Sequence, residues 1–342
     1  MQLGHIFTTA FNAILPILLL ILLGNFLRRI GFLSDEFVKV GNKFVFHVCL
    51  SCSLFINVYD IRNLASIQWD FIAYVVAAIF VLFLLGFIAA LSASKDPGQR
   101  GVVLHGVFRS NFAIIGLSLA AALGSQEAST VASVVSAFAM PLYNIFGVIA
   151  LSIFSNAPKT EKRGIKSVVL SIVKNPMIVG AFLGLVCLVI RELQTCIFGE
   201  VVFSVKDRLP FVYSALNSLK TLTSPLALVV LGAQFQFSAV KGMFRQIAVG
   251  TMWRIVVAPA LCVGGAVLLS TYTDLLHCGA NEYPALIALF GSPAAVSTAV
   301  MAGQMGGDEQ LATQIVVWSS IGSVFTIFLQ VCILMAAGLL TI

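Results

Sequence analysis

Long apolar stretches, separated by short polar gaps, run through the entire chain. A helix needs about twenty mostly apolar residues to cross the hydrocarbon core of a bilayer. Ten stretches of this kind can be read from the sequence, although the sixth reaches that length only if it extends back through Val168–Val173. The pattern predicts an all-α polytopic membrane protein with ten transmembrane helices. The stretches are Thr8–Leu27, Lys39–Val58, Phe71–Leu91, Gly101–Leu123, Val131–Phe154, Met177–Ile190, Phe211–Phe235, Ile247–Leu269, Pro284–Met305 and Thr313–Leu340.

The composition indicates that lipid solvates most of this apolar surface. Apolar residues make up 59% of the 342 residues and charged residues 10%, and the mean hydropathy is +1.03. Soluble chains have roughly 45–50% apolar and about 25% charged residues. The net charge of +6 does not indicate a nucleic-acid partner, because the basic residues lie in the short gaps, as in cytoplasmic loops of membrane proteins. No Lys or Arg precedes the first stretch, so we interpret it as a retained helix and not a signal peptide.

The distribution of Lys and Arg over the gaps predicts the orientation of the chain. With an outside N-terminus and ten helices, thirteen basic residues fall in gaps on the inner side and four in gaps on the outer side. Cytoplasmic loops carry such an excess of basic residues. We therefore expect a multi-pass protein of the cell membrane (inner or plasma membrane) with both termini outside.

The ten helices divide into two halves of five, which must have opposite orientations because five is an odd number. Inverted repeats of this kind are common in secondary transporters. Polar residues interrupt the second helix of each half, at 50–54 and 223–227, and the fourth helix of each half, at 109–118 and 291–298. The predicted organisation is a first five-helix repeat over residues 1–155, a basic cytoplasmic linker over 156–174 and a second, inverted five-helix repeat over 175–342.

The fourth and ninth stretches carry the residues best suited to a binding site. Asn111 and Ser118 are seven residues apart and so share one helix face, with Gly116 between them. Pro293 lacks an N–H and frees carbonyls at mid-membrane depth, which only protein or a water-filled cavity can satisfy. Two interrupted helices at equivalent places indicate a transport site whose half-helix N-termini suit an anion; alternatively, the small residues only allow close helix packing. The candidate substrate-binding residues are Ser110, Asn111, Gly116, Ser118, Asn144, Pro293, Ser297 and Gln304.

Charged side chains inside the predicted helices are few, and all are basic. Arg109 and Arg254 lie close enough to the cytoplasmic face to snorkel towards it, which is our expectation for Arg109 in particular. Lys220 lies deeper, and either snorkelling or a place in an anion pathway is open for it. All fourteen acidic residues lie in gaps or at helix ends. This argues against an exchanger that carries protons or sodium on mid-membrane carboxylates.

The sequence gives no indication of enzymatic chemistry. It contains no phosphate-binding loop, no HExxH and no nucleophile elbow, so we expect neither an enzyme nor an ATP-driven pump. We expect no cofactor and no metal site, since Cys49 and Cys52 have CxxC spacing but no other ligands beside them in an apolar helix. Cys196 and Cys278 both fall in outer gaps, and a disulfide between them is a hypothesis.

Several segments resemble the auxin efflux carrier family, and they are spread over nearly the whole chain. The resemblance implies ten helices in two inverted repeats with crossover helices 4 and 9, both termini outside and, in many members, a homodimer. It also implies export or exchange of organic anions: plant members carry auxin, and bacterial members include malate and malonate permeases. Asn111 matches the crossover asparagine that meets the substrate carboxylate, and Pro293 matches the second crossover. The similar segments are residues 42–46, 108–117, 175–176, 225–232 and 292–308.

The chain departs from this family pattern at two positions. Many relatives have proline where this chain has Ser51 and Ser118, which leaves Gly116 as the place where the fourth helix can still unwind. We expect a secondary transporter of a small organic anion, a mono- or dicarboxylate such as malate, that works in the lipid bilayer by alternating access at the crossover. The alternative is a membrane sensor or binding module of the same fold, which binds a lipid or a metabolite without transporting it.

Overall fold

The computed structural model describes residues 2–60, 68–123, 126–155, 176–235 and 240–340. Within these residues the regular elements are helical, apart from one isolated β-bridge. The predicted linker over 156–174 lies outside the described residues. In chain order the elements are α1 (Gln2–Arg29), α2 (Asp35–Phe44), η1 (Val45–Cys49), α3 (Leu50–Tyr59), α4 (Trp69–Ala93), α5 (Pro97–Phe108), η2 (Phe112–Gly116), α6 (Leu117–Leu123), α7 (Gln126–Ile153), α9 (Pro176–Phe198), α10 (Val205–Arg208), α11 (Pro210–Gln234), α12 (Val240–Met252), η4 (Trp253–Val257), α13 (Ala258–Tyr272), α14 (Glu282–Leu286), η5 (Ile287–Gly291), α15 (Val296–Met305) and α16 (Glu309–Ala336).

Seven helical stretches in the described part of the chain are long and apolar enough to cross a membrane. They correspond to the second, third, fifth, sixth, seventh, eighth and tenth predicted stretches, and the all-helical, multi-pass character predicted from the apolar pattern is confirmed. The other three predicted stretches are α1 and the two interrupted helices α5–α6 and α14–α15. The seven are Asp35–Tyr59, Trp69–Ala93, Glu127–Ile153, Ile178–Phe198, Pro210–Gln234, Val240–Tyr272 and Glu309–Ala336.

One detail of the predicted helices is extended and another is corrected. The sixth stretch gains its length forwards, to Phe198, whereas the proposed backward extension through 168–173 lies outside the described residues. The polar residues 223–227 do not interrupt α11, which is continuous although Pro225 lies inside it. In the second stretch the π-helical turn η1 comes just before residues 50–54, and α3 then runs through them.

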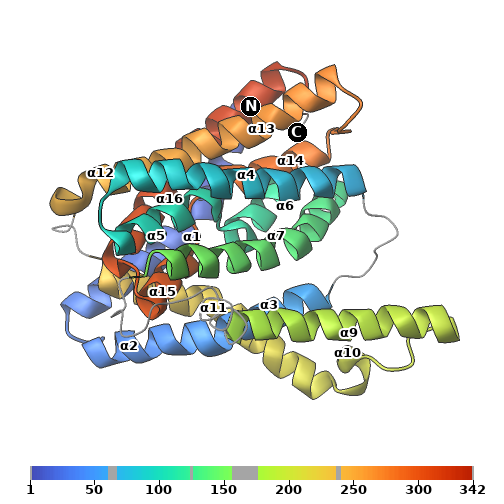
Figure 1. Ribbon diagram of the computed structural model, residues 1–342, viewed down its shortest axis with the longest axis horizontal. Coiled ribbons are helices and arrows are strands. Elements are labelled where there is room, and N and C mark those ends of the chain that lie inside the picture. Colours follow the sequence, from blue (N-terminus) through green and yellow to red (C-terminus); the bar gives the residue numbers. More distant parts are fainter. Residues whose placement is uncertain (1, 61–67, 124–125, 156–175, 236–239, 341–342) are drawn as a thin grey trace.

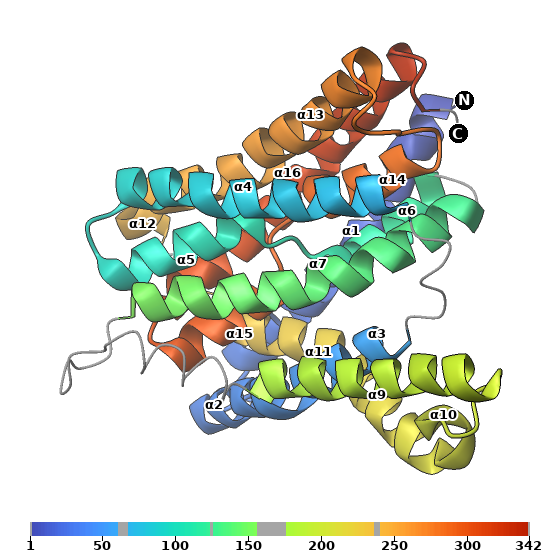
Figure 2. The same cartoon turned by 45° about the vertical axis from the view of Figure 1, so that its right-hand side comes forward.

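The helices form two layers, which are visible in both views (Figures 1 and 2). One layer contains α2, α3, α9, α10 and α11, and the other contains α4, α5, α7, α12, α13 and α16. Helix α1 contacts α11 of the first layer and α16 of the second. Side chains also connect the layers, because Gln234 of α11 donates a hydrogen bond to Glu309 of α16 (Nε2 to Oε1, 2.7 Å) and Asn42 of α2 donates to the same oxygen.

Large apolar side chains cover the outside of the bundle, and its interior, although mostly apolar, also holds buried polar side chains. Leu22, Phe182 and Phe325 have exposed fractions of 60%, 62% and 64%, whereas Ser319 and Ser320 of α16 are fully buried. The hydroxyls of Ser319 (3.1 Å) and Ser320 (2.7 Å) both donate to the backbone carbonyl of Val316, one turn earlier in the helix. This arrangement suits a hydrocarbon solvent around the protein.

Helices α1 and α11 pack backbone against backbone at two glycines. A Cβ atom on Gly24 would lie 2.0 Å from the carbonyl oxygen of Val229, and one on Gly232 would lie 2.0 Å from that of Ile21. Any side chain at either position would overlap a backbone oxygen. Helices α3 and α9 approach in the same way, at Gly180 and Gly184 of α9. We call α1–α11 and α3–α9 the glycine-packed pairs; small residues permit such close contact in membranes.

Candidate functional site

Two helices stop inside the protein and continue after a short extended segment. Helix α5 ends at Phe108 and the next helical residue is Phe112; η5 ends at Gly291 and α15 begins at Val296. Each break leaves the last carbonyls of one half-helix and the first N–H groups of the other without helical partners. These groups need other partners, because the hydrocarbon around the protein offers none.

The two extended segments cross and pair with each other as an antiparallel β-bridge. The N–H of Asn111 donates to the carbonyl of Pro293 (2.8 Å), and the N–H of Ala295 donates to the carbonyl of Arg109 (3.3 Å). Proline suits its place here, since it has no N–H to satisfy and contributes only its carbonyl. We call the paired segments, residues 109–111 and 292–295, the crossover.

The place where the fourth predicted helix unwinds differs from the expectation. It unwinds at residues 109–111 and not at Gly116, which closes a π-helical turn. The reason is the backbone pairing with the second segment, which holds residues 109–111 extended. Gly116 instead permits close helix packing, because a Cβ there would lie 2.8 Å from the carbonyl oxygen of Ala288.

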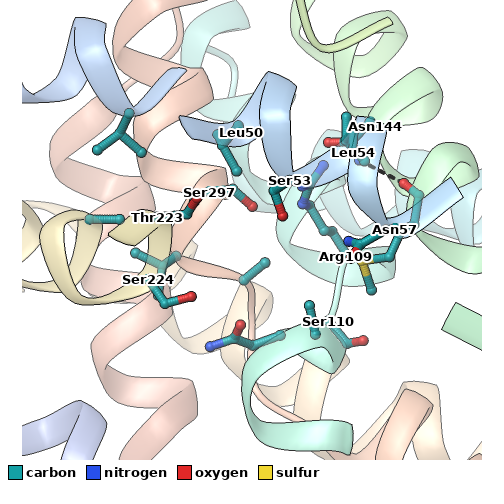
Figure 3. Close-up of a pocket in the computed structure, with 17 residues that line it drawn as sticks. Leu50, Ser53, Leu54, Asn57, Arg109, Ser110, Asn144, Thr223, Ser224 and Ser297 are labelled. Carbon is teal, nitrogen blue, oxygen red and sulfur yellow. Dashed lines mark hydrogen bonds between the residues drawn. The ribbon is translucent and has the colours of Figure 1, made fainter. Parts of the chain in front are cut away.

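A cavity of about 70 Å³ adjoins the crossover (Figure 3). It is lined from four directions: by η1 and α3, by the first crossover segment and the residues after it, by α7, and by α11 with the start of α15. Its lining includes one charged side chain, that of Arg109, among hydroxyls, amides and apolar groups. The polar and charged lining residues are Ser53, Asn57, Arg109, Ser110, Asn111, Asn144, Thr223, Ser224 and Ser297.

Half of the predicted site residues meet at this cavity. Pro293 belongs to the crossover without lining the cavity, and the side chain of Ser118 lies outside the described part of the structure. Gln304 follows Ser297 by seven residues on α15, about 10 Å further along the helix axis, and does not line the cavity. The four predicted residues that the structure brings together are Ser110, Asn111, Asn144 and Ser297.

The prediction that Arg109 snorkels to the membrane surface is wrong. Its exposed fraction is 4%, and its Nη1 donates to the carbonyl of Tyr143 (3.1 Å) and contacts the sulfur of Met301 (3.5 Å). No ion pair to Arg109 occurs among the described residues. Because residue 109 is in the extended segment, its side chain reaches into the bundle, and Figure 3 shows it among Ser53, Asn57 and the other labelled residues of the cavity.

Snorkelling is also wrong for Arg254, whose side chain is fully buried. It lies in the π-helical turn η4 and donates hydrogen bonds to three backbone carbonyls. These carbonyls come from α5 and η5, the helices that lead into the crossover. Protein groups therefore replace the water that a snorkelling arginine would reach.

Two amide side chains at the cavity retain polar atoms that have no hydrogen-bond partner in the described part of the chain. They are Nδ2 of Asn111 and Oδ1 of Asn144, on residues that are 4% and 1% exposed. The other end of the Asn144 amide donates to the carbonyl of Met140 (2.6 Å). A buried donor without an acceptor costs about 1–3 kcal/mol, so Nδ2 of Asn111 favours a ligand that accepts hydrogen bonds.

Four polar lining residues were not among the predicted site residues. Ser53 and Asn57 come from α3, and Thr223 and Ser224 come from α11. The signal for Ser53, Thr223 and Ser224 was present in the sequence, because 50–54 and 223–227 were read as matching polar interruptions in the two halves, whereas Asn57 lies outside both segments. Those residues do not break the helices but face the cavity.

Lys220 does not line the cavity, although it lies one turn before Ser224 on α11. Its side chain is half-buried and interacts electrostatically with Asp60. Tyr213 also contacts Asp60, through a hydroxyl that donates to Oδ1 (3.0 Å). The role of Lys220 in an anion pathway therefore stays a prediction.

The disulfide hypothesis is wrong, since Cys196 and Cys278 are both free thiols. Cys196 is exposed at the end of α9, whereas Cys278 lies in the segment between α13 and α14. Burial, with smaller contributions from the nearby carboxylates of Glu282 and Asp70, raises the pKa of the Cys278 thiol to about 12. Thiolate is the reactive form, so this thiol is a poor partner for oxidation.

Comparison with known proteins identifies the family to which this protein belongs. Residues 9–331 match the family described as membrane transport protein. The chain belongs to this family. This member of the membrane transport protein family is also similar to an uncharacterized transporter of Methanocaldococcus jannaschii, with 23% identity over 297 residues that cover 85% of this chain and 87% of that protein. The resemblance to the auxin efflux carriers is confirmed, and the protein is a multi-pass membrane transporter.

Proposed function

We propose that this membrane transport protein is a secondary transporter of a small organic anion, a mono- or dicarboxylate such as malate, and that it works by alternating access at the crossover. The observation that carries the proposal is the guanidinium of Arg109, which is buried at the cavity without a carboxylate partner among the described residues. Taking a charge out of water costs several kcal/mol unless an opposite charge compensates it. A bound carboxylate would supply that charge.

The electrostatic attraction between the buried guanidinium of Arg109 and a bound anion is large enough to select an anion. Two unit charges 4 Å apart attract by about 4 kcal/mol at an effective dielectric constant of about 20. Among the described residues, no acidic side chain lines the cavity to compete for the arginine. A cation would meet repulsion of similar size, so the site favours anions over cations.

Hydrogen-bond donors at the cavity complement the charge. Nδ2 of Asn111 has no hydrogen-bond partner within the described ranges, and Ser53 and Ser297 contribute hydroxyls to the cavity lining. The second half of each interrupted helix begins at the crossover, so its partial positive end adds to the potential felt by an anion. A carboxylate, with about four lone-pair sites, can accept several of these bonds at once.

The arrangement of the helices agrees with ten transmembrane helices in two inverted repeats. The interrupted helices α5–α6 and α14–α15 would be the fourth helix of each repeat, and their pairing supports equivalent places in a pseudo-symmetric fold. The first residues of α1 and the last of α16 lie near each other in both views, as two outside termini would. Together with the basic inner gaps, this favours a cell-membrane carrier with both termini outside, and the family resemblance adds a homodimer.

Flux into proteoliposomes tests this proposal. Radiolabelled malate, malonate, 2-oxoglutarate and indole acetate would each be offered with and without a pH or sodium gradient. Saturable uptake of at least one anion is expected, and its dependence on the gradient identifies the coupling ion. Binding without flux across the panel would contradict transport and favour the sensor.

Asn111→Ala tests the site within the same assay. Loss of a hydrogen bond to a charged group costs about 1.5–3 kcal/mol, so uptake should fall by at least about tenfold while the amount of folded protein is unchanged. Asn217→Ala, which removes an exposed amide from α11, is the matched control and should transport normally. Normal flux in Asn111→Ala would remove the central role of this residue.

A further inference from the structure

Arg254 joins the two interrupted helices at a point outside the cavity. Its Nη1 donates to the carbonyls of Val107 (3.1 Å) and Phe108 (2.9 Å), and its Nη2 donates to the carbonyl of Phe290. Phe108 is the last residue of α5, and Phe290 is the second-last residue of η5. One guanidinium thus binds the C-terminal carbonyls of both half-helices that enter the crossover.

The charge of Arg254 is balanced by these helix ends. No salt bridge to Arg254 occurs within the described ranges, and it does not line the cavity. Each helix C-terminus carries a partial charge of roughly −0.5, so two of them together approach the −1 that matches one guanidinium. The same carbonyls have lost their helical donors at the breaks, and the planar fork of an arginine can reach several of them at once.

We infer that Arg254 is a positioning residue for the substrate site. By binding the ends of α5 and η5 it fixes the crossover segments against each other, and so it fixes Arg109, the residue directly after Phe108, and Asn111 at the cavity wall. Without it, two partly negative helix ends would face each other in a medium of low dielectric constant. Lysine cannot replace it fully, because an ammonium group is a compact point charge without the fork geometry.

Hydrogen exchange measured by mass spectrometry tests this role without any substrate. The purified full-length protein would be compared with Arg254→Gln and Arg254→Lys. The N–H groups of Asn111 and Ala295 form the crossover backbone bonds, and their exchange should accelerate by about tenfold or more in Arg254→Gln and by less in Arg254→Lys.

The matched control is Arg245→Gln, which removes an exposed arginine from α12 that donates to a single carbonyl, that of Ser92 (2.5 Å). Exchange at the crossover should stay unchanged in this control. Unchanged exchange in Arg254→Gln, or equal acceleration in Arg245→Gln, would overturn the inference. If Arg254→Gln does not fold, Arg254→Lys carries the same test.

Transport kinetics provide a second readout, which rests on the proposed function. A purely structural role would lower the amount of active protein and therefore only the maximal rate. A positioning role predicts that KM for the anion rises severalfold in Arg254→Lys, because the binding groups themselves are displaced. An unchanged KM in that variant would contradict positioning. Accelerated exchange in a protein that transports no anion would leave the positioning role intact and count against the proposed function alone.

Discussion

In both the α1–α11 pair and the crossover, backbone lies against backbone, but different interactions hold the two regions together. At the glycine-packed pair, Gly24 and Gly232 lie against carbonyl oxygens with no room for a side chain. At the crossover, the two extended segments hydrogen-bond to each other, and the buried side chain of Arg254 binds the helix ends beside them. The first region depends on shape and the second on charge and hydrogen bonding, so we expect mutations to affect folding in the first and substrate binding in the second.

The largest expected effect is on folding, from Gly232→Ala. The added methyl group would lie 2.0 Å from the oxygen of Ile21, where real Cβ contacts stay beyond 3.0 Å. Backbone cannot yield as a side chain can, so we expect destabilisation at or above the usual 1–3 kcal/mol for overpacking. Thermal unfolding in detergent, followed by size-exclusion chromatography, would measure this.

Gly264→Ala in α13 is the control for the same chemical change. No atom of a neighbouring described residue lies within 4 Å of the Cβ that it would add. Replacing glycine by alanine inside a helix stabilises by about 1 kcal/mol, so this variant should unfold at the same or a higher temperature. Equal loss of stability in both variants would show that α1–α11 is not held by close contact.

Arg109→Met should separate binding from stability. Removing the charge from an anion pair in a buried site costs about 2–5 kcal/mol of affinity, which corresponds to a loss of binding of about 30-fold or more. The midpoint of thermal unfolding should stay the same or rise, because a buried unpaired charge is replaced by an apolar chain of similar volume. Calorimetric binding and thermal unfolding, measured on the same preparation, would test the expected loss of affinity and the unchanged or higher unfolding midpoint. A marked loss of stability would make the crossover a packing region like α1–α11.

The smallest expected effect is the loss of anion affinity in Ser297→Ala. Ser297→Ala removes one hydroxyl from the cavity wall, and a single neutral hydrogen bond contributes about 0.5–1.5 kcal/mol. The apparent affinity for the anion should fall by about two- to twelvefold. Gln304→Ala, on the same helix but away from the cavity, should leave the affinity unchanged; an equal effect of both changes would place the site further along α15.

The fold was predictable to the extent that it follows from apolar length and from the chemistry of single residues. Runs of about twenty apolar residues identify helices whatever their neighbours are, and Pro293 predicts a break because it cannot continue a helix. Asn111, Asn144 and Ser297 were identified because amides and hydroxyls are rare in apolar helices. The exact point of unwinding at residues 109–111 was missed, because the pairing segment lies some 180 residues away in the chain.

The two arginines show what such reasoning cannot supply. Position along a helix suggested snorkelling, but direction around the helix and distant partners decide where a long side chain goes. Arg254 finds carbonyl partners 146 and 36 residues away, and nothing local in the sequence indicates them. Gln304 has the residue type that suits a binding site, but its position along α15 keeps it from lining the cavity.

The π-helical turns determine which residues face the cavity. The turn η1 (Val45–Cys49) directly precedes α3, the helix that presents Ser53 and Asn57. A π-helical turn holds one residue more than the α-helical turn it replaces, and each residue rotates a helix by about 100°. If η1 rewound as a regular α-helix with no residue removed, the wide turn would no longer absorb the extra residue, and the whole of α3 would rotate by more than a quarter of a circle. The chain would keep its length and hydropathy as a membrane span, but its polar face would point away from the cavity.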